Sequence, residues 1–362
     1  MKPVILLVLD KMIRAGTQRH VLHTLRSMGS DYEFHVACLE GPGSWDLEVI
    51  GTGAVLHRYA MNRIYDAGGL ETLAGLHRLI RHINPAGVEA LMFTAHLASA
   101  VCSGGIPMIS SPREKCLWRK PRHLMLKKLA NRRYRLHLAN SKAVADDLTQ
   151  REGVSPDQIR LVPNSLDPAD FEPVSSALPP VPGRINAVVV SAFKPVKQHA
   201  LLLEALATSQ ELISKLAVTF YGEGPLRPAL EQVVARLNLG DVVRFAGSAD
   251  RVPGRLQGYD FAIHPSQSEA MSNAILEAMA AGLPPVALGT DGNLECIEDG
   301  ITGLLLPSPS APTMAQGLLH MVEDAEGRKR MGREAKSRAW ERYSLEAMAG
   351  AKRSAYREAF GC

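Results

Sequence analysis

Two glutamates eight residues apart, Glu269 and Glu277, carry the most distinctive chemistry in this sequence of 362 residues. Glu269 follows a Ser-rich turn, and Glu277 lies in a run of good helix formers that stops at Gly282. Ser272 is a favourable N-cap, so we expect a helix whose first backbone amides face the region around Glu269. Helix N-termini of this kind bind anions such as phosphate. The pattern therefore predicts a site for a phosphorylated ligand.

The same helix carries Asn273, which lies four residues before Glu277 and shares its face, so a ligand at the N-terminus can meet both side chains. An ordinary amphipathic helix with a solvated glutamate accounts for part of this pattern. The complete block at residues 265–287 resembles the Glu-x7-Glu signature of the retaining GT-B glycosyltransferases of family 4.

Shorter blocks that resemble the same family follow in order along most of the chain. They lie at residues 138–143, 160–167, 221–225, 243–247 and 299–305. The resemblance implies an α/β fold of the GT-B type, in which two Rossmann-like, doubly wound parallel-sheet domains face a central cleft. It also implies a C-terminal helix that returns to the N-terminal domain.

The hydropathy pattern by itself favours an α/β fold. Apolar strand candidates at residues 4–9, 34–39, 91–93 and 108–110 alternate with longer amphipathic stretches, and the alternation restarts at 185–190. Such alternation is typical of a parallel sheet with helices on both faces. Between the two series, a Pro- and Ser-rich segment with almost no charge is typical of a linker.

We therefore expect two domains, as the length also suggests. The first is an acceptor-side domain of residues 1–175, completed by a C-terminal helix at about 341–362. A linker covers residues 176–184. The second domain, residues 185–340, is expected to bind the nucleotide sugar.

A loop with two lysines follows the strand candidate at 185–190, at the end where such sheets bind ligands. It resembles the phosphate-binding loop of the family, in which Lys197 takes the place of the family lysine. Ala192 replaces the family arginine, and Lys194 matches a variant with a cation three residues before the lysine. Two lysines beside a proline are also typical of a solvated loop.

The resemblance assigns Glu277 to the ribose hydroxyls of the donor and Glu269 to hydroxyls of the transferred sugar. A carboxylate suits paired hydroxyls because each oxygen accepts one hydrogen bond, which the charge strengthens. The expected catalytic residues are Lys197, Glu269 and His96. The expected donor-binding residues are Gly16, Lys194, Lys197, Glu269, Met271, Ser272, Asn273 and Glu277.

Two of these residues come from the N-terminal half of the chain. His96 follows a strand candidate, where many family members carry a His that faces the transferred sugar, and a buried structural His is the competing interpretation. Gly16 allows close approach of the backbone to the diphosphate, although Ala15 breaks the glycine pair of the family. Base recognition is expected near Phe245 and Ser248, with a core role as the alternative for Phe245.

A strongly basic segment spans residues 113–135. It contains ten Lys and Arg residues and one acidic residue, a net charge of +9 in a protein whose total is +4. A solvated basic helix explains this composition, and so does docking on an anionic membrane or a pyrophosphate-linked acceptor. We expect no nucleic-acid partner, since no binding module is present. The residues predicted to dock are Arg119, Lys120, Lys127, Lys128, Arg132 and Arg133.

Composition argues against several other classes of protein. Five scattered cysteines without a Cys-x-x-Cys pattern indicate neither a disulfide framework nor a zinc site, which fits a reducing cytosol. His and Asp residues lack metal-ligand spacing, so we expect no metal and no cofactor beyond the nucleotide sugar as co-substrate. The first apolar run is too short for a signal peptide or a membrane span. We expect a cytoplasmic protein that can lie peripherally on the cytoplasmic face of the membrane.

The resemblance therefore implies a metal-independent, retaining glycosyltransferase. It would move a hexose or N-acetylhexosamine from a nucleoside diphosphate sugar, UDP favoured over GDP, to a polysaccharide, glycolipid or lipid-linked acceptor. One alternative is a catalytically inactive GT-B binding module, which the departures at Ala15 and Ala192 permit. Another is a GT-B phosphorylase or epimerase, which needs a phosphate site or an acid/base set that the sequence does not reveal.

Overall fold

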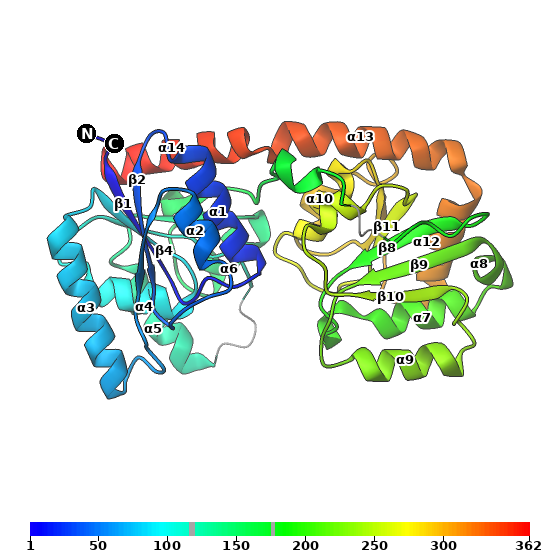
Figure 1. The fold of residues 1–362 in the computed structure, drawn as a ribbon, viewed down its shortest axis with the longest axis horizontal. Coiled ribbons are helices and arrows are strands. Elements are labelled where there is room, and N and C mark those ends of the chain that lie inside the picture. The colour runs from blue at the N-terminus through cyan, green and yellow to red at the C-terminus, as the bar shows by residue number, and fades with distance from the viewer. Residues whose placement is uncertain (116–119, 175–177) are drawn as a thin grey trace. The chain divides into compact units, whose positions relative to one another are not determined.

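The computed structural model describes residues 1–115, 120–174 and 178–362 (Figure 1). The chain folds as two compact units, one of Met1–Ser165 with Leu345–Cys362 and one of Leu166–Ser344. Each unit is built on a parallel sheet with helices, so the predicted α/β class is confirmed. The predicted return of the C-terminal helix is also confirmed, because α14 (Leu345–Phe360) belongs to the first unit.

The second unit begins before the predicted domain boundary at residue 175. The Leu166 amide donates to the carbonyl oxygen of Tyr343 at 2.7 Å. This bond attaches the chain that follows the first unit to the end of α13 (Ala325–Tyr343). Residues 175–177, which include the start of the predicted linker, lie outside the described residues.

The first unit contains a seven-stranded parallel sheet with the order β3-β2-β1-β4-β5-β6-β7. Its strands are β1 (Val4–Leu9), β2 (Glu33–Cys38), β3 (Val55–Arg58), β4 (Gly87–Ala90), β5 (Met108–Ser110), β6 (Leu136–Ala139) and β7 (Ile159–Leu161). Its other helices are α1 (Gly16–Met28), α2 (Asp46–Gly51), α3 (Ala67–Ile83), α4 (Phe93–Cys102), α5 (Pro121–Asn131) and α6 (Lys142–Gln150).

Strand β1 shows why the strands of this sheet are continuous apolar runs in the sequence. Leu7 and Leu9 pack in a core with α1 and α14, whereas Leu6 and Val8 pack in a second core with α3 and α4. Both faces of the strand are therefore buried, so alternation of polar and apolar residues is not needed.

The strand predicted at residues 91–93 does not form. β4 ends at Ala90, Met92 adopts a positive φ of 73°, and Phe93 begins α4. The Asp10 carboxylate, just after β1, accepts a hydrogen bond of 2.9 Å from the Ala95 amide and so holds the first turn of α4 against the end of β1.

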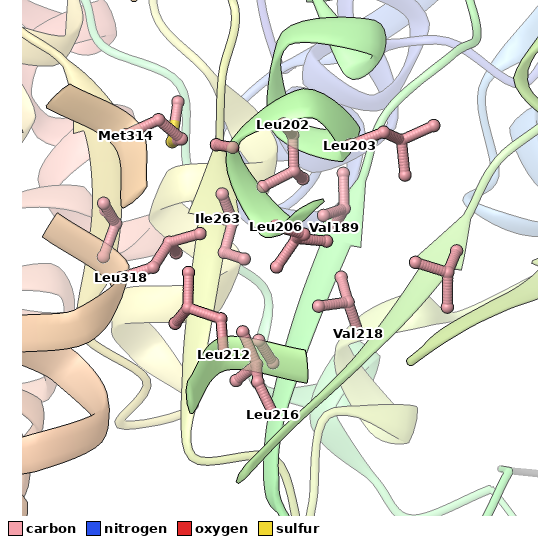
Figure 2. Packing of buried hydrophobic residues seen from close by; sticks show 14 of the residues in the cluster. Val189, Leu202, Leu203, Leu206, Leu212, Leu216, Val218, Ile263, Met314 and Leu318 are labelled. Atoms are coloured by element: carbon pink, nitrogen blue, oxygen red, sulfur yellow. The ribbon is translucent and has the colours of Figure 1, made fainter. Parts of the chain in front are cut away.

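The second unit contains a six-stranded parallel sheet with the order β10-β9-β8-β11-β12-β13. Its strands are β8 (Ile185–Val190), β9 (Leu216–Tyr221), β10 (Val243–Gly247), β11 (Phe261–His264), β12 (Pro285–Leu288) and β13 (Leu304–Leu306). Its other helices are α7 (His199–Ala207), α8 (Gln210–Lys215), α9 (Arg227–Arg236), α10 (Asn273–Ala280), α11 (Asn293–Cys296) and α12 (Ala311–Glu323). Figure 2 shows Val189, Ile263, Leu202 and Leu318 meeting in its core from β8, β11, α7 and α12.

A buried ion pair fixes α14 to the first unit. Lys352 Nζ lies 3.0 Å from Glu89 Oε1 and donates to Thr24 Oγ1 at 2.8 Å, and the Tyr356 hydroxyl donates to the other oxygen of Glu89. Burial lowers the pKa of Lys352 to about 8, although Glu89 opposes this drop. Burial raises the pKa of Glu89, but the charge of Lys352 and hydrogen bonds bring it below its usual value, so both groups are charged at neutral pH and depend on each other for compensation.

We predict that Lys352→Met destabilises the first unit by about 3–5 kcal/mol, because it leaves the Glu89 carboxylate buried without its cation. The double variant Glu89→Gln/Lys352→Met removes both charges and should recover most of the loss. Urea unfolding followed by circular dichroism measures the effect, with Arg357→Met on the exposed face of α14 as the control. Equal stability of Lys352→Met and this control would contradict the prediction.

Candidate active site

Helix α10 begins where its sequence predicts. The Ser272 hydroxyl accepts a hydrogen bond from the Ile275 amide, which caps the helix, and Gly282 with a φ of 84° follows its end. Glu277 is only 6% exposed, so it is not the solvated glutamate of an ordinary surface helix. The buried carboxylate of Glu277 and the capped N-terminus therefore belong to the same helix, α10.

The loop that carries the two lysines lies beside the loop that leads into α10. Strands β8 and β11 are parallel neighbours, so the loops at their carboxyl ends leave the same edge of the sheet. The Gln267 amide donates to the Val196 carbonyl oxygen at 2.9 Å, which ties one loop to the other. The short 3₁₀ helix at Pro195–Lys197 then brings Lys197 to Glu269.

Two side chains contact the carboxylate of Glu269. Lys197 Nζ donates to Glu269 Oε1 in a short contact, and His264 Nε2 lies 2.9 Å from the same oxygen. An ionised carboxylate only accepts hydrogen bonds, so His264 carries its proton on Nε2 and donates it. His264 is the last residue of β11 and is 4% exposed.

These contacts decide the charge of Glu269. Burial alone would raise the pKa of this carboxyl, but the hydrogen bond from His264 and the charge of Lys197 lower it to about 2. Glu269 is therefore ionised at every physiological pH. The Glu269 carboxylate, which accepts hydrogen bonds, thus lies with the Lys197 cation and the N-terminus of α10 at one edge of the sheet.

The loop after β9 completes this edge through two glycines. A Cβ on Gly222 would lie 1.9 Å from the Ser191 carbonyl oxygen, and one on Gly224 would meet the Phe193 backbone at 2.6–3.0 Å. Both glycines also have φ near 155°, a conformation that other residues rarely adopt. Only glycine therefore allows this loop to pack against the residues that follow β8.

Two family models match this chain and together cover most of it. Residues 172–338 match the model described as glycosyl transferases group 1, and residues 14–170 match glycosyltransferase family 4. The chain belongs to glycosyltransferase family 4. The second unit, with the site around Glu269, corresponds to the group 1 model.

Curated relatives give partial matches. A D-inositol 3-phosphate glycosyltransferase of Kribbella flavida is 32% identical over 61% of this chain and 56% of its own length. An N-acetylgalactosaminyltransferase of Campylobacter jejuni, which acts on a diphospho-undecaprenol-linked saccharide, is 30% identical over 56% of this chain and 55% of its own. The chain therefore matches about half the length of these relatives.

Solved structures of low identity share the whole fold. The Anabaena protein HepE, in complex with UDP, matches 99% of this chain and 100% of its own, with a TM-score of 0.85 and 18% identity. Sucrose-phosphate synthase of Thermosynechococcus elongatus gives a TM-score of 0.80 at 17% identity, over 99% and 100% of the two chains. The predicted GT-B fold of this family member is confirmed.

The other donor residues predicted in the second unit lie close to the same edge. Met271 and Ser272 are buried at the start of α10, and Asn273 is half-buried as its first residue. Lys194 is exposed at the start of the 3₁₀ helix that carries Lys197. Their roles in binding stay predictions.

The structure favours the structural interpretation of His96. Because α4 begins at Phe93, His96 lies in a helix and not at a strand end, and its ring is 1% exposed. It stacks on Tyr134 with ring centroids 4.1 Å apart, and its carbonyl oxygen accepts the Tyr134 hydroxyl at 2.7 Å. Gly16, by contrast, is exposed as the first residue of α1.

Phe245 also has a structural role. Its ring packs 5.8 Å from that of Phe193 and 5.4 Å from that of Phe220, between centroids, and Arg227 covers it at 5.7 Å. Ser248 is exposed just beyond β10. The core alternative therefore explains Phe245 without a ligand.

The basic segment divides into buried and exposed residues. Lys127 is 2% exposed and lies 3.3 Å from Glu152, so its assignment to a docking surface is wrong: it pairs α5 with the turn that follows α6. Arg119 lies outside the described residues. The predicted basic residues that are exposed are Lys120, Lys128, Arg132 and Arg133. The same helix exposes Met125, Leu126 and Leu129.

Sequence reasoning missed two polar residues at the ends of central strands. His264 contacts Glu269, and its only signal was a polar residue closing an apolar strand before Pro265. Asp10 closes β1 in the same way; burial, partly offset by the Ala95 amide, raises its pKa to about 6. Across the described residues, no group of three or more His, Cys, Asp and Glu side chains has an arrangement that could hold a metal ion.

We predict that Glu277→Ala and Lys197→Ala each weaken nucleotide binding by roughly 10- to 150-fold, the cost of about 1.5–3 kcal/mol for losing a charged hydrogen-bond partner. Titration calorimetry with UDP and with GDP measures the affinities. Glu204→Ala, which changes an exposed glutamate on α7, is the matched control. Wild-type affinity in both site variants would mean that the nucleotide binds elsewhere.

Proposed function

We propose that this protein transfers a hexosyl or N-acetylhexosaminyl group from a nucleoside diphosphate sugar, UDP favoured over GDP, to a glycan, glycolipid or lipid-linked acceptor. The observation that carries the proposal is the convergence of Lys197, Glu269 and the N-terminus of α10 at one sheet edge. The names of the two curated relatives describe glycosyl transfer, and HepE has been solved with UDP and with UDP-glucose. These likenesses support a UDP-sugar donor.

Each group at the sheet edge has a distinct task in this proposal. Lys197, helped by Lys194 and the first amides of α10, binds the diphosphate and stabilises the negative charge that develops on it as the sugar leaves. Glu277 accepts hydrogen bonds from the ribose hydroxyls. Glu269 accepts them from the transferred sugar, for which its ionised state is suited.

The transfer retains the anomeric configuration in this proposal. The acceptor hydroxyl attacks from the face that the diphosphate leaves, and a donor phosphate oxygen takes its proton. The bond from the anomeric carbon to the diphosphate breaks as the new glycosidic bond forms. No covalent enzyme intermediate forms in this proposal.

The proposal assigns no task to a metal or to a cofactor, because Lys197, Lys194 and a helix terminus supply the positive charge. We therefore predict slow release of UDP when the protein is incubated with UDP-glucose or UDP-N-acetylglucosamine without an acceptor, at the same rate with EDTA as with magnesium. A coupled assay for free UDP measures it.

Loss of activity in EDTA with recovery on addition of magnesium or manganese would contradict the metal-independent mechanism. Nucleotide binding without any turnover would instead favour the inactive binding module. Release that requires inorganic phosphate would favour a phosphorylase.

We further propose that the acceptor is presented at an anionic membrane surface, where the protein docks peripherally from the cytoplasmic side through α5. The exposed residues of this helix combine basic side chains with three apolar ones, Met125, Leu126 and Leu129. This composition suits a helix that lies in the interface of an anionic bilayer. None of the helices within the described ranges has the length and apolar character needed to cross a membrane.

We predict that the protein sediments with anionic vesicles at low salt and detaches at high salt, because the attraction fades within about 8 Å in physiological salt. The variant Lys128→Gln/Arg132→Gln/Arg133→Gln should lose roughly 100-fold in vesicle affinity, at about 1 kcal/mol for each basic residue near the surface. Nucleotide affinity should stay unchanged.

The matched control is Arg63→Gln/Arg78→Gln/Arg81→Gln, which removes three exposed charges in and near α3 of the same unit. Equal vesicle binding by both triple variants would mean that α5 is a solvated helix with no role in docking. Binding to neutral vesicles with the same affinity would contradict the electrostatic part of the proposal.

A further inference from the structure

We propose that His264 is a positioning residue for Glu269, which holds that carboxylate in place for the donor sugar when the diphosphate draws Lys197 away. The inference rests on the proposed donor site and adds a residue to which no role had been given. It predicts that His264 governs recognition of the sugar rather than of the nucleotide.

The two partners of Glu269 differ in how firmly they are held. His264 is buried at the end of a central strand and pairs in register with Ala287 of β12. The backbone that carries its imidazole is therefore held by the sheet. Lys197 lies on a short 3₁₀ turn and reaches Glu269 with a flexible four-carbon side chain that is 20% exposed. Lys197 is therefore the partner that can move.

The same lysine cannot serve two anions equally well. Its ammonium group is bound to Glu269 in this structure, whereas a bound diphosphate would offer it a greater negative charge nearby. If Lys197 were the sole partner of Glu269, donor binding would release this carboxylate when the sugar needs it oriented. His264 removes this conflict, since its bond to Glu269 does not depend on the lysine.

A ligand hydroxyl can bond to Glu269 at its second carboxylate oxygen. Lys197 and His264 both bond to Oε1. A carboxylate accepts several hydrogen bonds over its two oxygens, so Oε2 can accept a sugar hydroxyl while Oε1 stays with His264. The imidazole thus sets the direction in which the second oxygen faces.

Three substitutions separate this role from general packing. His264→Leu removes the donor but fills the space. In His264→Gln the side-chain amide nitrogen can reach the position of Nε2. In His264→Asn the amide nitrogen takes the position of Nδ1 instead and cannot reach Glu269. Rescue by Gln and not by Asn is therefore expected only if the bond from Nε2 matters.

The experiment compares, for each variant, the dissociation constant of a nucleotide sugar with that of its nucleoside diphosphate. The probe is the nucleotide sugar that stabilises the wild type most in a thermal-shift screen of UDP-, GDP- and ADP-sugars. The gain in affinity from the sugar is the dissociation constant of the nucleoside diphosphate divided by that of the nucleotide sugar. We expect this ratio to fall roughly tenfold or more in His264→Leu and His264→Asn. His264→Gln should keep it, and kcat should follow the same order.

An unchanged gain from the sugar in His264→Leu would overturn the role of His264 while leaving the donor site intact. Equal losses in the Gln, Asn and Leu variants, with weaker binding of the diphosphate as well, would mean that His264 only supports the fold of the loop. If no nucleotide sugar binds the wild type, the donor proposal fails first, and this one fails with it.

Discussion

The meeting of Lys197 with Glu269 depends on one constraint: β8 and β11 are parallel neighbours in the sheet of the second unit. Parallel strands send their following loops to the same edge, so residues that are 72 positions apart in sequence become partners. The Gln267–Val196 hydrogen bond and the two glycines after β9 then fix the loops at that edge. The charged site therefore depends on the order of the buried apolar strands in the sheet.

Charge pairing governs both units, with different consequences. In the first unit, Lys352 and Glu89 are sealed in the core, where the pair joins α14 to the sheet. In the second unit, Lys197 and Glu269 are partly exposed, at 20% and 15% of their side chains, and a ligand can reach them. A partly exposed ion pair can exchange one partner for a ligand, whereas a buried pair that loses one partner leaves an uncompensated charge.

Local features were predicted well from the sequence. The N-cap at Ser272 and the stop at Gly282 depend on neighbouring residues, so α10 lies where its pattern indicated. The same holds for β1, β5 and β8, whose apolar runs match the observed strands. The family signature also indicated that Glu269 and Lys197 belong to one site, and the structure brings them into contact.

Features that depend on distant partners were not predictable. Lys127 had the composition of a surface residue, and only the position of Glu152 shows that it is buried. His96 was expected at a strand end, but the backbone turn at Met92 starts a helix before it. His264 gave only a weak signal, a polar residue at the end of an apolar strand, because its role depends on where the next loop places Glu269.

The most direct test of this account is a crystal structure of the protein with UDP bound. The account predicts the diphosphate at the N-terminus of α10, Lys197 turned from Glu269 to a phosphate oxygen, and Glu277 within hydrogen-bonding distance of the ribose. His264 should still donate to Glu269. UDP bound elsewhere, or a Lys197 that stays on Glu269 with the diphosphate held by other groups, would contradict it.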